Sequence, residues 1–106
     1  MALALTGTIN GRSIRHFLRD GDQIVGRAAS SHLRLPDSSV SRTHAKISVS
    51  GGQVTVTDLD SSNGTSINGS PVTRPRPLSV GDKVAFADVE LTLVESSPPA
   101  ETVYSA

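Results

Sequence analysis

Three glycine-containing dipeptides, each between short stretches of alternating apolar residues, constrain the fold of this chain more than any other feature. They are Asn10-Gly11, Gly51-Gly52 and Asn68-Gly69. Such pairs readily adopt the positive φ angles of a two-residue hairpin turn, which joins neighbouring antiparallel strands. No stretch of the sequence sustains the apolar period of an amphipathic helix. The sequence therefore predicts an all-β chain that is folded largely from hairpins.

The clearest hairpin pairs residues 44–49 with residues 53–59. Alternate positions of both segments are apolar, as in Ala45, Ile47 and Val49, so one face of each strand would be buried. Further strands are expected at residues 2–8, 13–19, 23–27, 33–35, 65–67, 83–86 and 89–94. Many short strands with turn signals between them indicate a β-sandwich of two mainly antiparallel, twisted sheets with about 10–11 strands.

Prolines interrupt the pattern after the third dipeptide. Pro71, Pro75 and Pro77 predict an irregular or edge-like segment, because proline cannot donate to a central hydrogen-bond ladder. The length of 106 residues corresponds to one domain. We expect residues 1–95 to form that domain.

The composition changes over residues 96–106, which read Ser-Ser-Pro-Pro-Ala-Glu-Thr-Val-Tyr-Ser-Ala. This predicts a disordered tail or a linker. Thr102 lies in this segment and, if phosphorylated, could bind a neighbouring copy of the chain. An inert linker is the simpler expectation.

Charge and composition exclude several classes of function. Lys+Arg and Asp+Glu both number 10, so the formal net charge is zero and no bulk attraction to nucleic acid is expected. The sequence has no cysteine, which rules out disulfides and thiol zinc sites. His16, His32 and His44 show no metal-ligand spacing, so neither a metal nor another cofactor is expected.

The start of the sequence bears on localisation. It lacks the basic region of a signal peptide, and its apolar run is too short to cross a membrane. We therefore expect a cytoplasmic protein without a membrane partner.

Polar residues and glycines gather at the ends of several predicted strands. Gly26-Arg27 ends one strand, Ser41-Arg42-Thr43-His44 leads into the next, and Ser62-Asn63-Gly64-Thr65 follows the clearest hairpin. The glycines allow sharp turns of the backbone. Loops on a rigid sandwich could present the arginine, hydroxyl and amide groups together. These donors suit an anionic oxygen cluster such as a phosphate.

In this order and spacing the motifs resemble the forkhead-associated (FHA) family of phosphothreonine-binding modules. The signature spans residues 26–69, and flanking strands extend the resemblance from about residue 3 to residue 94. The resemblance implies an FHA/SMAD-like β-sandwich that binds phosphothreonine peptides and proteins in Ser/Thr kinase signalling. It implies recruitment of phosphorylated partners without catalysis, by a monomer or by part of a larger polypeptide.

The resemblance also implies five contacts with the phosphopeptide. Arg27 matches an arginine that contacts phosphate or nearby peptide backbone, and Ser41 matches a hydroxyl that bonds a phosphate oxygen. Arg42 stands where the family uses a polar or basic residue against the phosphate, and Ser62 matches a further Ser/Thr contact. Asn63 matches an asparagine whose amide contacts the peptide main chain beside the phosphorylated residue.

A second set of residues would support the site without touching the peptide. By resemblance, His44 lies behind the binding loops and holds them by hydrogen bonds. The residues that would set the loop geometry are Gly26, Gly64, Thr65, Asn68 and Gly69. Two positions depart from the family: Ser39 is small and neutral, so no preference for an acidic +3 residue follows, and Ala87 stands where glycine is frequent.

Each motif also has a simpler interpretation. Arg27 could be a solvated strand-end arginine, Ser41 a turn hydroxyl, and Asn63-Gly64 a hairpin signal without a ligand. The alternative function is a structural or adhesion-type β-sandwich interaction domain without phosphate dependence. An enzyme would have to use Ser41, His44 and Asp58, but the sequence has no nucleophile elbow or oxyanion motif beside them.

Overall fold

A computed structural model describes residues 2–96 of the chain, and these residues form eleven strands. The strands are β1 (Ala2–Ile9), β2 (Arg12–Phe17), β3 (Gly21–Gly26), β4 (Leu33–Arg34), β5 (Ala45–Ser50), β6 (Gln53–Asp58), β7 (Thr65–Ile67), β8 (Ser70–Pro71), β9 (Arg76–Leu78), β10 (Lys83–Phe86) and β11 (Val89–Ser96). Residues 97–106 of the predicted tail, Thr102 included, lie outside the described residues. No segment of residues 2–96 forms a helix with the length and apolarity that crossing a membrane requires.

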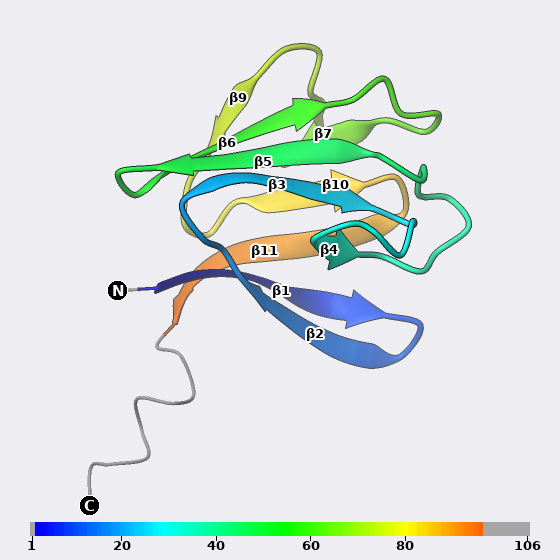
Figure 1. The fold of residues 1–106 in the computed structure, drawn as a ribbon, viewed down its shortest axis with the longest axis horizontal. Coiled ribbons are helices and arrows are strands. Elements are labelled where there is room, and N and C mark those ends of the chain that lie inside the picture. Colours follow the sequence, from blue (N-terminus) through cyan, green and yellow to red (C-terminus); the bar gives the residue numbers. More distant parts are fainter. Residues whose placement is uncertain (1, 97–106) are drawn as a thin grey trace, which may run out of the picture.

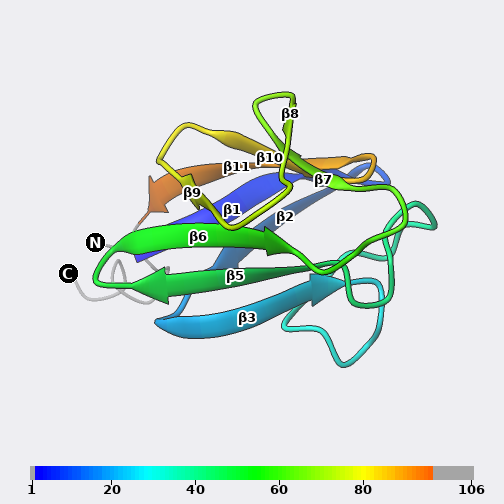
Figure 2. The same ribbon diagram turned by 90° about the horizontal axis from the view of Figure 1, so that it is seen from above.

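The strands form two sheets that pack face to face. One has the order β2-β1-β11-β10-β7-β8 and the other β4-β3-β5-β6-β9. Figure 1 shows how the strands are arranged, and Figure 2 shows the two layers from above. The paired strands are antiparallel except β3 and β4, which run parallel. The predicted β-sandwich of two mainly antiparallel sheets is thus confirmed.

The turn signals of the sequence produce the expected hairpins. β5 and β6 pair in the register Ile47↔Val56 and Val49↔Val54, and the φ angles of Gly51 and Gly52 are 57° and 81°. Positive φ also occurs at both residues of Asn10-Gly11 and of Asn68-Gly69. The last hairpin turns at Ala87, a non-glycine residue with a φ of 57°.

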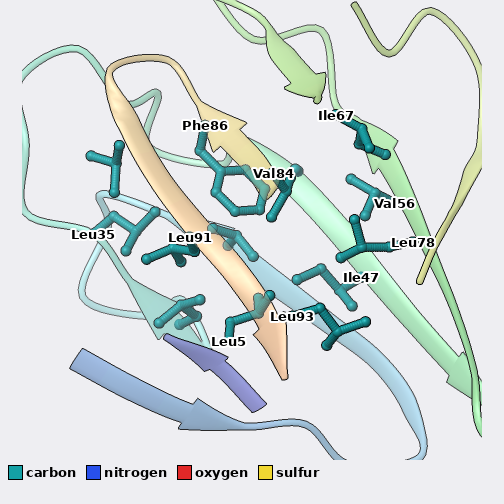
Figure 3. Packing of buried hydrophobic residues seen from close by; sticks show 14 of the residues in the cluster. Leu5, Leu35, Ile47, Val56, Ile67, Leu78, Val84, Phe86, Leu91 and Leu93 are labelled. Atoms are coloured by element: carbon teal, nitrogen blue, oxygen red, sulfur yellow. The ribbon is translucent and has the colours of Figure 1, made fainter. Parts of the chain in front are cut away.

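The core lies between the two sheets, and Figure 3 shows part of it. Phe86, Leu5 and Ile47 are fully buried, as alternation along their strands predicts. Leu35 and Val40 belong to the loop between β4 and β5 and are equally buried. This loop is therefore anchored to the core at two points.

Some strand ends differ from the prediction. β3 begins at Gly21, because Gly21 and Asp22 continue the pairing with β5 where the sequence suggested a turn. β2 ends at Phe17, short of the predicted Arg19, whose main chain binds the side chain of Gln23. Within the proline-rich segment, β9 contains Pro77 and is the last strand of its sheet, where it pairs with β6, so the edge-like prediction is confirmed.

Three loops meet at one end of the sandwich: residues 27–32, 35–44 and 59–64. Main-chain hydrogen bonds join them to each other and to the strands. The N–H of His44 donates to the carbonyl of Val25, that of Leu59 to the carbonyl of His44, and that of Ala87 to the carbonyl of Gly64. In Figure 1 these loops lie on the right, whereas β1 begins and β11 ends on the left.

Candidate functional site

The end of β3 lies directly against the loop that contains Ser41. The N–H of Arg27 donates to the Ser41 carbonyl over 3.0 Å, and the N–H of Ala28 donates to the Arg42 carbonyl over 3.2 Å. A Cβ atom on Gly26 would overlap the carbonyl oxygen of Arg42. Only glycine allows so close an approach of the two main chains. The Gly26-Arg27 pair thus places Arg27 beside Ser41 and Arg42.

Two arginines near this contact are held through Nε by main-chain carbonyls. Arg27 Nε donates to the Val40 carbonyl over 3.0 Å, and Arg34 Nε donates to the Arg27 carbonyl over 3.2 Å. Arg27, Arg34 and Arg42 line one open pocket of about 650 Å³, with Asp37 on its wall. In the part of the chain that the structure describes, the one ion pair joins Lys46 to Asp22 at 4.0 Å. None of the three arginines is therefore paired with a carboxylate there.

His44 holds two of the loops together from beneath. Its Nδ1 accepts a hydrogen bond from the N–H of Ser41 over 3.0 Å. The proton of the neutral ring is therefore on Nε2, which donates to the Gly64 carbonyl over 2.9 Å. The ring is fully buried and packs edge-on against Phe86, with 5.9 Å between centroids and 87° between planes. Both ring nitrogens are engaged with main-chain groups.

Side-chain hydrogen bonds join the same loops on the solvent side. Ser41 Oγ accepts a hydrogen bond from the N–H of Ser62 over 3.0 Å. Asn63 Nδ2 donates to the Ser39 carbonyl over 2.7 Å, and its Oδ1 accepts no hydrogen bond from residues 2–96. Ser62 and Asn63 are exposed, whereas Ser41 is half-buried.

Asp58 closes the loop that leads to Asn63. Its carboxylate accepts hydrogen bonds from the N–H and Oγ of Ser61 and from Oγ of Thr65, at 3.1, 2.6 and 2.7 Å. Partial burial raises the pKa of Asp58, but these hydrogen bonds to the charged form outweigh it and hold the pKa below its ordinary value. Ser61 Oγ also accepts the N–H of Gly64.

Ser39 joins three parts of the site, a role that the sequence did not reveal. Its N–H and Oγ donate to Asp37 Oδ1, and its Oγ accepts the N–H of Asp88 over 3.2 Å. Its carbonyl holds Asn63. The hydrogen bonds from Ser39 lower the pKa of Asp37. The Asp-x-Ser spacing, which favours a local side-chain-to-main-chain turn, was the available signal.

The structure brings most of the predicted residues together. The five predicted contacts, Arg27, Ser41, Arg42, Ser62 and Asn63, all lie on the three loops at one end of the sandwich. Asn68 and Gly69 do not join them: they form the turn after β7, at the end of that strand away from Thr65. There Asn68 bonds Lys83 and Asp82. Arg34 lines the pocket but was missing from the predicted set.

The arrangement suits binding better than bond breaking. His44 contacts the main chain of Ser41 instead of its hydroxyl, so it is not placed to remove a proton from Ser41 Oγ. Among residues 2–96, no group of three or more His, Cys, Asp or Glu residues could hold a metal ion. The site instead offers exposed guanidinium, hydroxyl and amide groups on loops that are fixed by hydrogen bonds.

Comparison with known proteins places these loops in a family. The profile of the FHA domain matches residues 24–87. The chain is 37% identical over 82 residues to the FHA domain-containing protein FhaA of Mycobacterium tuberculosis; the match covers 77% of this chain and 15% of FhaA. The curated relatives that it matches are longer, and the chain spans between 15% and 55% of their length.

Solved structures share the fold closely. One, from a structural and functional analysis of phosphothreonine-dependent FHA domain interactions, has a TM-score of 0.82 and 31% identity, and covers 92% of this chain and 100% of its own. Mycobacterium tuberculosis EmbR, solved in complex with a low-affinity phosphopeptide, has a TM-score of 0.80 and 28% identity. That match covers 92% of this chain and 25% of the EmbR chain.

Proposed function

The chain belongs to the FHA domain family, and we propose that it binds peptides and proteins phosphorylated on threonine. It would recruit such partners in Ser/Thr kinase signalling. The observation that carries this proposal is the group of three arginines at the loop end of a rigid sandwich, which have no carboxylate partner among residues 2–96. The phosphothreonine-dependent interactions of one similar domain and the phosphopeptide complex of EmbR support it.

The phosphate would sit between Arg27, Arg42 and the hydroxyls of Ser41 and Ser62. A phosphorylated side chain carries roughly −1.5 to −2 charges and strong acceptor oxygens. Charge-assisted hydrogen bonds contribute about 1.5–3 kcal/mol each, and neutral ones about 0.5–1.5 kcal/mol. Two cationic and two hydroxyl contacts would thus contribute about 4–9 kcal/mol before the cost of ordering the peptide, so binding near ~1 μM, or about −8 kcal/mol, would also draw on contacts with the rest of the peptide.

Asn63 would contact the main chain of the peptide. Its Nδ2 is held by the Ser39 carbonyl, which fixes the orientation of the side-chain amide. The remaining Oδ1 can accept an N–H from the residue beside the phosphothreonine. The loop of Asn63 would thus position the peptide main chain, while the arginines bind the phosphate.

The domain would act by binding alone, in the cytoplasm, as a monomer or as a module of a longer polypeptide. The contacts of His44 support an absence of catalysis, because both ring nitrogens bond the main chain. The alternative is an adhesion-type sandwich without phosphate dependence. It gives no reason for three arginines to line one pocket without a carboxylate partner in the described part of the chain.

One calorimetric experiment with three peptides tests the proposal. The peptides are identical except for threonine, phosphothreonine or phosphoserine at the central position. Binding to the phosphothreonine peptide alone, or several-fold more tightly than to phosphoserine, is the expected result. Burial of the additional methyl group contributes about 0.8 kcal/mol, and the restricted χ1 of threonine adds to this.

Two outcomes of that titration would contradict parts of the proposal. Equal affinity for the phosphorylated and unphosphorylated threonine peptides would overturn phosphate-dependent binding altogether. Equal affinity for phosphothreonine and phosphoserine would retain phosphate recognition and remove the preference for threonine.

A further inference from the structure

The pocket beside Ser41 contains more cationic groups than one phosphate requires. Arg27, Arg34 and Arg42 all line it. Its volume of about 650 Å³ falls within the range of roughly 300–1,000 Å³ that protein ligand pockets occupy. Ser41 and Ser62 do not line the pocket, so a phosphate held by their hydroxyls and by Arg27 and Arg42 would lie at its edge and leave room inside it for a second group of the ligand.

Arg34 is the member of this group that the proposed phosphothreonine site leaves unused. It ends β4, and the parallel register of β3 and β4 places it opposite Gly26. Its Nε donates to the Arg27 carbonyl, while its terminal nitrogens have no hydrogen-bond partner within residues 2–96. The side chain is exposed and partly oriented by this one hydrogen bond, which lowers the entropy that a ligand contact would cost.

The charges around the pocket do not cancel. Asp37 is the one carboxylate on its wall, and its Oδ1 already accepts two hydrogen bonds from Ser39. Those hydrogen bonds lower the pKa of Asp37, so it is ionised at neutral pH. No arginine nitrogen lies within 4.0 Å of its carboxylate. Three guanidinium groups and one carboxylate leave two positive charges, in a chain whose formal net charge is zero.

We propose that Arg34 binds a second anionic group of the ligand, so that this chain prefers phosphothreonine peptides with another negative charge nearby. The proposal rests on the proposed function: Arg27 and Arg42 take the phosphate of the phosphothreonine, and Arg34 takes the additional group. The second group must be a cluster of anionic oxygens, because such a cluster accepts paired hydrogen bonds from the planar fork of a guanidinium. An acidic side chain or a second phosphorylated residue can supply it.

Calorimetric titration of the full chain distinguishes the two sources. The reference peptide has one phosphothreonine between neutral residues. In a series of variants, glutamate is moved through the three positions on either side, and phosphoserine then replaces it at the best position. We expect glutamate at one position to raise affinity about two- to fivefold, the size of one partly exposed ion pair. Phosphoserine should raise it further because of its larger charge.

Substitutions of Arg34 assign this gain to one side chain. Arg34→Ala should abolish the gain and leave affinity for the reference peptide within about twofold of the parent. Arg34→Lys should keep part of the gain, because it retains the charge but loses the fork. Arg12→Ala, which removes an exposed arginine from β2 in the other sheet, should change neither affinity. Melting temperatures check that every variant is folded.

The possible failures are distinguishable. If the reference phosphopeptide binds but no second anion strengthens it, the role of Arg34 is overturned and the proposed function stands. If Arg34→Ala weakens both peptides equally, Arg34 acts on the phosphothreonine or through Arg27, and the proposal is again overturned. If the reference peptide binds no better than its unphosphorylated form, both proposals fall together.

Discussion

The two ends of the sandwich are closed by turns of similar chemistry. At the loop end, the N–H of Ser61 donates to Asp58, and at the opposite end, the N–H of Ser79 donates to Asp82. Hydrogen bonds to the charged carboxylate lower the pKa of both aspartates. Such polar turns satisfy main-chain groups wherever a strand ends, so by themselves they do not identify a binding site.

The ends differ in what lies beneath and around these turns. The loop end rests on buried His44 and carries the three arginines of the pocket. At the opposite end, a hollow of about 310 Å³ is lined largely by apolar and small residues, among them the exposed Val80. The proposed binding end is therefore distinguished by a buried histidine that holds two loops and by clustered cations that have no carboxylate partner within residues 2–96. Matched substitutions at the two ends test this difference.

The largest expected effect is that of Gly26→Ala. Its methyl group would collide with the main chain of Arg42, which must move, so stability should fall by about 1–3 kcal/mol. Because the Ser41 loop moves too, phosphopeptide affinity should fall at least tenfold. Gly81→Ala is the control: the site is open but has a φ of +95°, so strain should lower stability without affecting affinity. Thermal melts measure the stability of the two variants, and peptide titrations measure their affinity for the phosphopeptide. Unchanged affinity in Gly26→Ala would show that the close contact does not position the loop.

Next in size is the effect of Arg27→Ala, which should separate binding from folding. Loss of a charge-assisted contact should lower affinity by about 1.5–3 kcal/mol, roughly tenfold or more. The melting temperature should hardly change, since the side chain is exposed. Arg76→Ala is the matched control, because Arg76 also donates to a carbonyl, that of Ser70, but outside the site. A similar loss of affinity in both variants would mean that the effect is one of general charge.

His44→Ala should affect stability and affinity together. Without the ring, the N–H of Ser41 loses its partner and the carbonyl of Gly64 loses one of its two, the other being the N–H of Ala87, which together cost about 1–3 kcal/mol of stability. Affinity should fall because the two loops are no longer tied. Asn68→Ala, which breaks hydrogen bonds at the opposite end, should lower stability alone. Should His44→Ala melt like the parent yet fail to bind peptide, His44 would be a direct contact and its supporting role would be wrong.

The two ends also differ in how far the sequence predicts them. The hairpin of β5 and β6 was predictable because alternation and a Gly-Gly turn specify both its faces and its register. Leu35 alternates with Leu33 in the predicted strand at residues 33–35, whereas Val40 lies in an aperiodic loop where no pattern marks it as buried. The start of β3 was missed because Gly21 suggests a turn, although pairing with β5 continues through it.

Family motifs predicted the site residues and the hydrogen bonds of His44 behind the loops, but not the contacts of Asn63 and Arg34. Resemblance pointed to Ser41 and Asn63, but the hydrogen bond from Asn63 to Ser39 depends on how two loops meet. The position of Arg34 depends on β4 lying parallel to β3, a pairing that a two-residue strand does not reveal. Short-range patterns specify strands and turns, whereas a pocket between loops depends on tertiary packing.

The smallest expected effect is the loss of stability in two aspartate variants, Asp58→Asn at the loop end and Asp82→Asn at the other end. The pKa of Asp58 is lower in the folded chain than its ordinary value of about 3.9. Its carboxylate therefore stabilises the fold above about pH 4, and this contribution is lost as the pH falls through the lowered pKa. Asp58→Asn replaces one carboxylate oxygen by an NH2 group, which cannot accept a hydrogen bond. This group faces either the N–H or the hydroxyl of Ser61, so one hydrogen bond to the carboxylate is lost and stability at pH 7 should fall by about 0.5–1.5 kcal/mol.

Urea unfolding at pH 7, 5 and 3 measures this contribution. Each variant should lose less stability than the parent between pH 5 and pH 3, because one group that must be protonated is gone and the pKa of Asp82 is lowered as well. Only Asp58→Asn should also weaken phosphopeptide binding at pH 7, since its carboxylate holds the loop that leads to Asn63 through Ser61 and Thr65. If Asp82→Asn weakens binding as much, the turns at both ends influence the site. Binding would then depend on the sandwich as a whole, and the distinction between its two ends would not hold.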